Sequence, residues 1–307
     1  MAIRSIAALQ TGTSPEGTAD TVERILAFEP DIAEARPDLL VLPEATLGGY
    51  PKGRDFGTRI GIRTDAGRTE FLEYWQQSVL MDGPELRAVA DLARRCRCAI
   101  VVGIIERAGA TLYCTAVFLS ADGEIVGKHR KLMPTASERL IWGMGDGSTM
   151  PVIETPAGRA AAAICWENFM PLFRCALYAK GVDVWCAPTV DDRDTWQTAM
   201  RYIAYEARSF LVSACQFVPA GAEAAESRPV IRGGSVIVSP MGEVLAGPLF
   251  DQPGLILADI DLQDVVRARY DFDAVGHYAR SDIFHLSVDE AEREAVSTTR
   301  EAESDDE

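Results

Sequence analysis

The sequence predicts an α/β fold with a mixed sheet, and three patterns indicate it. The apolar runs at residues 3–9 and 39–42 predict strands, and the amphipathic segment 18–35 between them predicts a helix. A strand–helix–strand opening of this kind is typical of α/β proteins. The runs at 98–105 and 112–119 are separated by a few small residues, which predicts a hairpin. The sheet is therefore expected to contain antiparallel as well as parallel strands.

Composition places the chain among ordinary globular proteins. Its 307 residues are 48% hydrophobic and 25% charged, and no apolar run reaches the length of about 18 residues that a membrane span needs. The first ten residues predict a strand and lack the basic region and cleavage site of a signal peptide. We therefore expect a cytoplasmic protein without a membrane partner. A formal net charge of −16 also argues against nucleic acid as a partner.

The cysteines and histidines indicate neither a disulfide framework nor a metal site. The seven cysteines are an odd number without a Cys-x-x-Cys pair, which favours free thiols in a reducing compartment. The three histidines show no spacing typical of metal ligands. A metal is therefore not expected.

The rest of the chain continues the same alternation of helices and strands. Residues 50–69 are rich in glycine and charge and predict a long surface excursion, which in a compact domain is often functional or interfacial. Apolar periodicity predicts further helices at 70–80, 84–95, 172–180 and 194–208, and further strands at 124–126, 182–187, 210–217, 234–239, 244–245 and 255–260. Residues 1–287 are expected to form one domain, and the acidic tail 288–307 is expected to be disordered by its composition.

Three reactive side chains stand at positions where catalytic groups accumulate. Glu44 follows the apolar strand 39–42, at the edge of the sheet where α/β proteins bind ligands. Lys131 closes the basic cluster 128–131. Cys165 ends an apolar strand just before a predicted helix, the geometry that holds a nucleophile near free backbone N–H groups. Each also has an ordinary structural interpretation: a surface acid, a solvated basic face and a buried inert thiol. Spacing alone does not show that the three meet.

The motifs around these residues resemble those of the nitrilase superfamily, and more narrowly its nitrilase branch. The resemblance runs from about residue 3 to residue 286 and keeps the motif blocks in order. The matching blocks are Leu42-Pro43-Glu44-Ala45, Gly48-Gly49-Tyr50-Pro51, residues 128–135, Glu138-Arg139, Trp142-Gly143, Cys165-Trp166-Glu167-Asn168, residues 192–196, residues 232–235 and residues 275–278. A Glu, a Lys and a Cys that each lie in an extended motif make the match specific.

The resemblance implies a four-layer α-β-β-α sandwich with a catalytic triad of Glu44, Lys131 and Cys165. It implies Glu138 as a second carboxylate in the pocket, and it matches Asn168 and His277 to family positions without giving either a chemical step. Helices 172–180 and 194–208 match the segments through which family members dimerise. The segments 50–69 and 220–229 match places where nitrilases build larger spirals. A homodimer or a larger homo-oligomer is therefore expected.

The implied reaction is hydrolysis of an organic nitrile to a carboxylic acid and ammonia. Glu44 would act as the base that activates the Cys165 thiol, since a free thiol is mostly protonated at neutral pH. Lys131 would meet the nitrile nitrogen as it becomes anionic, and the Trp166 backbone N–H is a candidate second donor. The intermediates would be a thioimidate and then a thioester on Cys165, and no cofactor would take part.

The nature of the substrate and the exact reaction stay open at this point. Five residues are candidates for shaping the pocket, namely Tyr50, Trp142, Trp166, Thr189 and Val190. The aromatic residues among them favour an arylaliphatic or aliphatic nitrile as the substrate. The alternatives are an amidase or carbamoylase of the same fold, hydration of cyanide or a nitrile that stops at the amide, and a non-catalytic scaffold. The four intact reactive residues argue against the scaffold.

Overall fold

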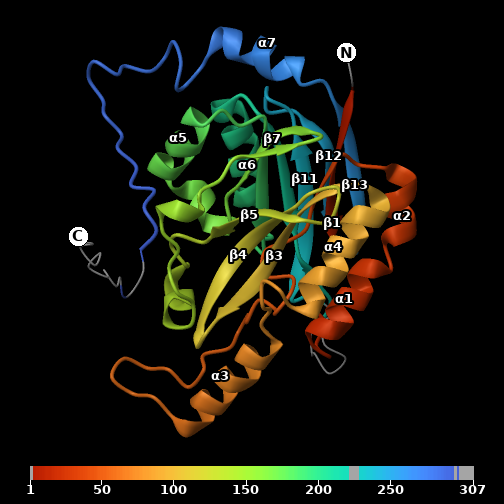
Figure 1. Cartoon of the computed structure of the whole chain (residues 1–307), viewed down its shortest axis with the longest axis vertical. Helices are drawn as coiled ribbons and strands as arrows, with labels where there is room; N and C mark the ends of the chain where they lie inside the picture. Colours follow the sequence, from red (N-terminus) through yellow and green to blue (C-terminus); the bar gives the residue numbers. More distant parts are fainter. Residues whose placement is uncertain (1–2, 221–227, 294–295, 297–307) are drawn as a thin grey trace, which may run out of the picture.

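The computed structural model describes residues 3–220, 228–293 and 296, and two mixed sheets form its centre (Figure 1). The first sheet has the strand order β13-β1-β2-β3-β4-β5, with β1 parallel to β2, β2 parallel to β3, and the other pairs antiparallel. Its strands are β1 (Arg4–Gln10), β2 (Leu39–Val41), β3 (Ala99–Ala108), β4 (Thr111–Leu119), β5 (Ile125–Arg130) and β13 (Gly254–Ile260).

The second sheet has the order β10-β11-β9-β8-β7-β6, and β12 also pairs with β11. Its central pairs β7–β8 and β8–β9 are parallel, and the flanking pairs are antiparallel. Its strands are β6 (Ile153–Thr155), β7 (Gly158–Ala162), β8 (Val184–Thr189), β9 (Phe210–Cys215), β10 (Phe217–Val218), β11 (Ile231–Val238) and β12 (Val244–Phe250).

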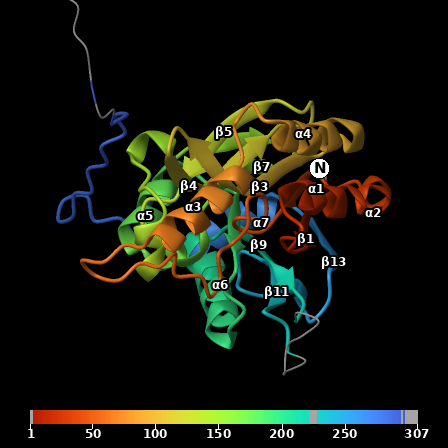
Figure 2. The same ribbon diagram turned by 90° about the horizontal axis from the view of Figure 1, so that it is seen from below.

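Helices cover the outer face of each sheet, which gives four layers (Figure 1). The first sheet carries α1 (Thr18–Leu26), α2 (Glu29–Ala35) and α4 (Pro84–Cys96), and the second carries α5 (Pro171–Ala179) and α6 (Asp194–Ala207). The helix α3 (Asp65–Gln77) and the loop before it lie at one end of the sandwich, nearest the viewer in Figure 2, and α7 (Gln263–Asp271) lies at the other end.

The alternation of side chains along the strands explains why two sheets pack together. In β1, Ile6 and Ala8 point into the core between the sheets, whereas Ala7 and Leu9 pack with the helices on the outer face. In β8, Cys186 lies in the central core and Trp185 packs with α5 and α6. A strand with apolar residues on both faces must be covered on both sides, and the four layers provide this.

The predicted fold class and the four-layer sandwich are confirmed, two local predictions are corrected, and one helix was missed. The segment 18–35 forms two helices because Pro30, which has no N–H to donate, starts a new helix at α2. The short strand predicted at 124–126 continues to Arg130 as β5, so most of the basic cluster lies in a strand. The helix α7 was not predicted.

The acidic tail and one loop fall partly outside the described residues. The structure does not describe residues 221–227 of the segment 220–229, nor residues 294–295 and 297–307 of the tail. The described beginning of the tail contacts the body, since the Arg293 backbone N–H donates to Asp146 Oδ2 at 2.8 Å and Lys180 pairs with Glu290.

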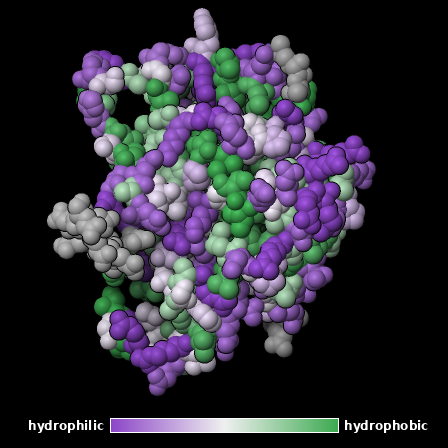
Figure 3. Space-filling view, in the orientation of Figure 1, coloured by the Kyte–Doolittle hydropathy of each residue, from purple (hydrophilic) through white to green (hydrophobic). Residues whose placement is uncertain are grey.

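The surface shown in Figure 3 is mostly hydrophilic, with apolar side chains gathered in a band near the centre of this face. Within the described part of the chain, no helix combines the length and the apolar character that crossing a bilayer requires.

Candidate active site

Glu44 lies just after β2 and is fully buried. The neighbouring strand β3 approaches its backbone closely at Gly103, where an added Cβ would lie 2.2 Å from the Pro43 carbonyl oxygen. Glycine is therefore needed at this point. The Glu44 carbonyl accepts a hydrogen bond of 2.7 Å from Gln216 Nε2, which crosses from the second sheet. The backbone around this carboxylate is held on both sides.

Lys131 follows β5 and places its ammonium group between two carboxylates. Its Nζ is 2.7 Å from Glu44 Oε1 and 2.9 Å from Glu138 Oε2, and the side chain is fully buried. Two other residues of the basic cluster face the opposite side of the strand, because alternate residues of a strand face opposite sides. Lys128 and Arg130 both pair with Glu106, a buried carboxylate of β3. Only part of the predicted cluster therefore serves the site.

Glu138 is held from two directions. It lies in the 3₁₀ helix Ala136–Leu140, and its Oε2 accepts the backbone N–H of Thr135 at 2.6 Å. Its Oε1 accepts the hydroxyl of Tyr50 at 2.7 Å. The second carboxylate thus has a fixed position against Lys131, and Tyr50 is tied to it.

Cys165 stands at the turn between β7 and the 3₁₀ helix Cys165–Phe169, with a φ of 51°. A non-glycine residue in this left-handed region is uncommon and strained. Two hydrogen bonds of 2.8 Å stabilise the turn, from Asn168 Nδ2 to the carbonyls of Ala163 and Cys165. The helix α5 follows with Pro171 in its first turn. The predicted sequence of strand, turn and helix around Cys165 is confirmed.

Glu44, Lys131 and Cys165 shift one another's pKa values. Burial raises the pKa of Glu44 above its ordinary value, although the Lys131 charge opposes this rise. Burial opposes the charged form of Lys131, but the negative charges around it, with Glu44 first among them, together raise the lysine pKa. Burial, and then the charge of Glu44, raises the pKa of the Cys165 thiol. At rest the thiol therefore keeps its proton beside a carboxylate that can take it.

A cavity of about 300 Å³ opens onto Cys165 and Glu138. Three of the residues expected to shape the pocket line it, namely Tyr50, Trp166 and Val190. Trp166 forms part of the rim, where its Nε1 donates to Asp191 Oδ2 at 3.0 Å. The cavity also contains polar and charged groups of the rim, namely Lys52, Thr135, Asp191, Asp192 and Arg193.

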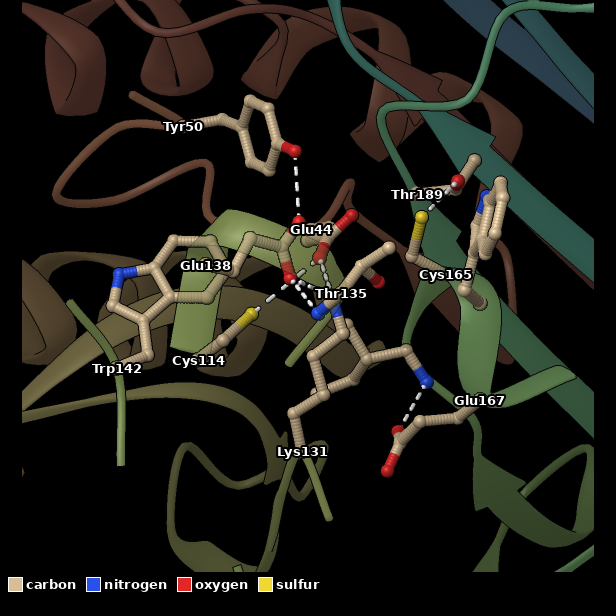
Figure 4. A network of polar contacts seen from close by, with 12 residues as sticks. Glu44, Tyr50, Cys114, Lys131, Thr135, Glu138, Trp142, Cys165, Glu167 and Thr189 are labelled. Carbon is tan, nitrogen blue, oxygen red and sulfur yellow. Dashed lines mark hydrogen bonds and ion pairs between the residues drawn. The ribbon is translucent and has the colours of Figure 1, made fainter. Parts of the chain in front are cut away.

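The other two predicted pocket residues do not line this cavity. Trp142 is buried behind Tyr50, with the two rings 5.8 Å apart, and its ring lies 5.5 Å from Lys131 Nζ. Thr189 is fully buried behind Cys165, and its Oγ1 lies 3.3 Å from Cys165 Sγ (Figure 4). Trp142 therefore packs around the lysine, and Thr189 contacts the thiol of Cys165.

Sequence reasoning missed two buried residues of this network, Cys114 and Glu167 (Figure 4). Cys114 of β4 lies 3.7 Å from Glu44 Oε1. The alternation Leu112, Cys114, Ala116 places it on the inner face, which was a usable signal. Glu167 is fully buried and accepts the Leu132 backbone N–H. Nothing in its spacing indicated that contact. In the described residues, no group of three or more His, Cys, Asp or Glu side chains is suited to a metal ion.

Comparisons with known proteins agree with this geometry. The family model described as carbon-nitrogen hydrolase matches residues 5–270. A protein of Bradyrhizobium diazoefficiens named as a nitrilase is 47% identical over 301 residues, which cover 95% of this chain and 94% of that protein. A bifunctional nitrilase/nitrile hydratase of Nicotiana tabacum is 48% identical over 295 residues, covering 92% of this chain and 84% of the relative.

The fold itself is also found among solved structures. Nit3 of Saccharomyces cerevisiae, described as a member of branch 10 of the nitrilase superfamily, aligns with a TM-score of 0.71. The alignment covers 90% of this chain and 96% of that one at 19% identity, so it concerns the fold alone. The matching family model and the identity to curated relatives define the class of protein. The chain belongs to the carbon–nitrogen hydrolase family, and the resemblance to the nitrilase superfamily is confirmed.

Proposed function

We propose that this protein is a nitrilase that hydrolyses an organic nitrile, arylaliphatic or aliphatic, to the carboxylic acid and ammonia. The observation that carries the proposal is the buried Lys131 ammonium between Glu44 and Glu138, in the site that also holds Cys165. An idle site has no physical reason to keep a lysine buried among carboxylates, because burying charge is costly. No cofactor or metal takes part in the proposed reaction.

The first half of the reaction forms a thioimidate. Glu44 accepts the Cys165 proton, and Sγ attacks the nitrile carbon as one π bond of the triple bond breaks. The electron pair moves to the nitrogen, which Lys131 meets with a proton. Its fixed charge is worth on the order of 3 kcal/mol at such a developing anion in a dry site. Glu138 keeps Lys131 in place, and Tyr50 fixes Glu138 in turn.

The second half releases both products. Glu44 first passes the thiol proton to Lys131, 2.7 Å away, which restores both groups. Water, activated by Glu44, then adds to the thioimidate carbon while Lys131 gives a proton to the nitrogen. The nitrogen leaves as ammonia when it takes the proton of the added hydroxyl, and the carbonyl of the thioester forms. The resulting thioester on Cys165 is attacked by a second water, which releases the carboxylic acid and returns the thiol. Collapse of the first water adduct by loss of sulfur instead of ammonia releases the amide.

Thr189 has a role in this scheme that its buried position supports. Its Oγ1 accepts the Asp191 backbone N–H at 2.9 Å, which leaves its own hydrogen free to point at Cys165 Sγ. A donor at this place stabilises the thiolate more than the thiol. We therefore assign Thr189 to the nucleophile instead of the pocket wall, where the sequence had placed it.

Replacing Thr189 with Val, which keeps the shape and removes the donor, should raise the pKa of the Cys165 thiol. We expect the pH profile of iodoacetamide labelling at Cys165 to move upward by about one unit, and kcat/KM at neutral pH to fall about tenfold. Thr189→Ser keeps a hydroxyl and should keep most of both values. A labelling profile that Thr189→Val leaves in place would contradict the assignment.

The test of reaction type compares a nitrile with the matching amide. We expect kcat/KM for 3-phenylpropionitrile to exceed that for 3-phenylpropionamide, because the linear nitrile presents one nitrogen to Lys131, whereas an amide needs partners for oxygen and nitrogen at once. Mass spectrometry should find an imidoyl or acyl adduct on Cys165. Equal or faster amide turnover would favour an amidase or carbamoylase.

A second candidate function is hydration of the nitrile to the amide. The relative from Nicotiana tabacum carries both activities in its name, and the same triad serves both outcomes. The ratio of acid to amide in the product mixture separates these two functions.

We also propose that the protein is cytoplasmic and that residues 1–287 form one domain. We further propose that it forms a homodimer or a larger homo-oligomer. Light scattering at micromolar concentration tests the assembly.

A further inference from the structure

Glu167 is a buried carboxylate that joins the two segments carrying Lys131 and Cys165. Its Oε1 accepts the Leu132 backbone N–H at 2.6 Å, and its Oε2 accepts the Ile164 backbone N–H at 2.8 Å. Leu132 comes directly after Lys131, and Ile164 comes directly before Cys165. The first segment leaves the first sheet after β5 and the second leaves the other sheet after β7. One carboxylate thus fixes the backbone beside two triad residues from different sheets (Figure 4).

His129 supplies the third contact of this carboxylate. Its Nε2 lies 2.9 Å from Glu167 Oε2, its Nδ1 lies 2.6 Å from the Thr149 carbonyl oxygen, and its ring stacks on Phe173. A carbonyl oxygen only accepts hydrogen bonds, so Nδ1 carries a proton. Both oxygens of Glu167 already accept a backbone N–H, so Nε2 also faces an acceptor and carries a proton as well. The contacts therefore describe an imidazolium paired with a carboxylate.

The surroundings of His129 leave Glu167 as its charged partner in the described part of the chain. Lys128 and Arg130, its neighbours in β5, face the other way and pair with Glu106. Ala116 lies beside it in β4, Phe173 covers it from α5, and the 3₁₀ helix Gly147–Thr149 presents the Thr149 carbonyl. Burial alone would lower the pKa of His129, but the charge of Glu167 and the hydrogen bonds raise it above its ordinary value.

We propose that the His129–Glu167 ion pair is a positioning device that sets the distance between the Cys165 thiol and the Lys131 ammonium. Neither residue takes part in the chemistry, and the inference rests on the proposed function only for its catalytic readout. When His129 loses its proton, Glu167 loses its buried cation and keeps only its two backbone N–H partners, so it holds the two segments less firmly. The assembled site then depends on pH through a group that does not touch the substrate.

The direction of this pH dependence follows from the pKa of His129. Its ordinary value of about 6.5 applies to the unfolded chain, and the folded value is higher. The stabilisation is therefore fully present below about pH 6.5 and is lost as the pH rises through the folded-state pKa. We expect the wild-type protein to lose both thermal stability and kcat on the alkaline side of its profile.

The test uses His129→Gln, Glu167→Gln and the double variant, with His285→Gln as the control because His285 is exposed. We expect kcat to fall on the order of 100-fold in the first two, with little change in KM, because the reacting groups are displaced by a fraction of an ångström or more. The double variant should be no worse than either single one. Iodoacetamide labelling of Cys165 should slow in parallel, and the alkaline loss of stability should disappear. His285→Gln should match the wild type.

Two results would overturn the proposal. One is a folded His129→Gln that keeps the wild-type kcat and the alkaline limb of its stability profile. The other, which needs no variant, is a neutral His129 ring at pH 7 in solid-state NMR of the wild-type protein carrying ¹⁵N-labelled histidine. A wild-type protein that hydrolyses no nitrile, but whose Cys165 labelling slows in both single variants, would refute the proposed function and support the positioning device.

Discussion

Replacing Cys165 with Ala is expected to abolish nitrile turnover while the protein stays folded. The thiol is the group that forms the proposed covalent intermediate, and no other described cysteine lines the cavity. Loss of a covalent nucleophile lowers kcat by on the order of 10⁶-fold. The side chain is small, so the cavity left by the sulfur costs little stability. Ammonia release and thermal unfolding, measured on one preparation, check both statements.

The matched control for this prediction is Cys186→Ala. Cys186 is a fully buried thiol of β8 in the central core and does not line the cavity. Its replacement should lower stability slightly and leave kcat near the wild-type value. If Cys165→Ala kept activity within tenfold of the wild type, Cys165 would not be the nucleophile.

Replacing Glu44 with Gln should lower kcat/KM on the order of 10³-fold, because the amide cannot accept the thiol proton. The substitution keeps the shape and leaves Lys131 paired with Glu138, so the fold should persist. A Glu44→Gln, Cys165→Ala double variant should be no slower than Cys165→Ala alone, since the residues act as a unit. Glu29→Gln, at a surface pair with Arg95, is the control. Activity within tenfold of the wild type would remove Glu44 from the role of base.

The fold could be predicted from the sequence wherever a strand has apolar residues over its whole length. Runs such as 39–42 and 182–187 form strands that are buried on both faces. A continuous apolar run predicts such an inner strand, covered on both sides. The break at Pro30 was missed because the amphipathic pattern continues through it. The helix α7 was missed because its nine residues include two buried ones, too few to give a clear period.

Prediction of the site from the sequence is limited in a different way. Local patterns placed Glu44 and Cys165 correctly at the ends of β2 and β7, because the strand and its end are visible in the sequence. The contact between Glu167 and Leu132 depends on how the two sheets pack against each other, because the two residues follow strands of different sheets. Thr189 lies against Sγ because β8 runs parallel to β7, which is also a property of the assembled sheet. Such long-range contacts have no local signal.

The pairing of β13 with β1 has a consequence for synthesis on the ribosome. Among the described strands, Arg4–Gln10 is synthesised first, and its antiparallel neighbour Gly254–Ile260 is synthesised last. Until then β1 exposes an unpaired edge seven residues long, which invites pairing with other chains. Nascent chains are thus expected to need a chaperone until residue 260 has left the exit tunnel. A premature stop before this strand should yield insoluble protein, however complete the triad encoded upstream.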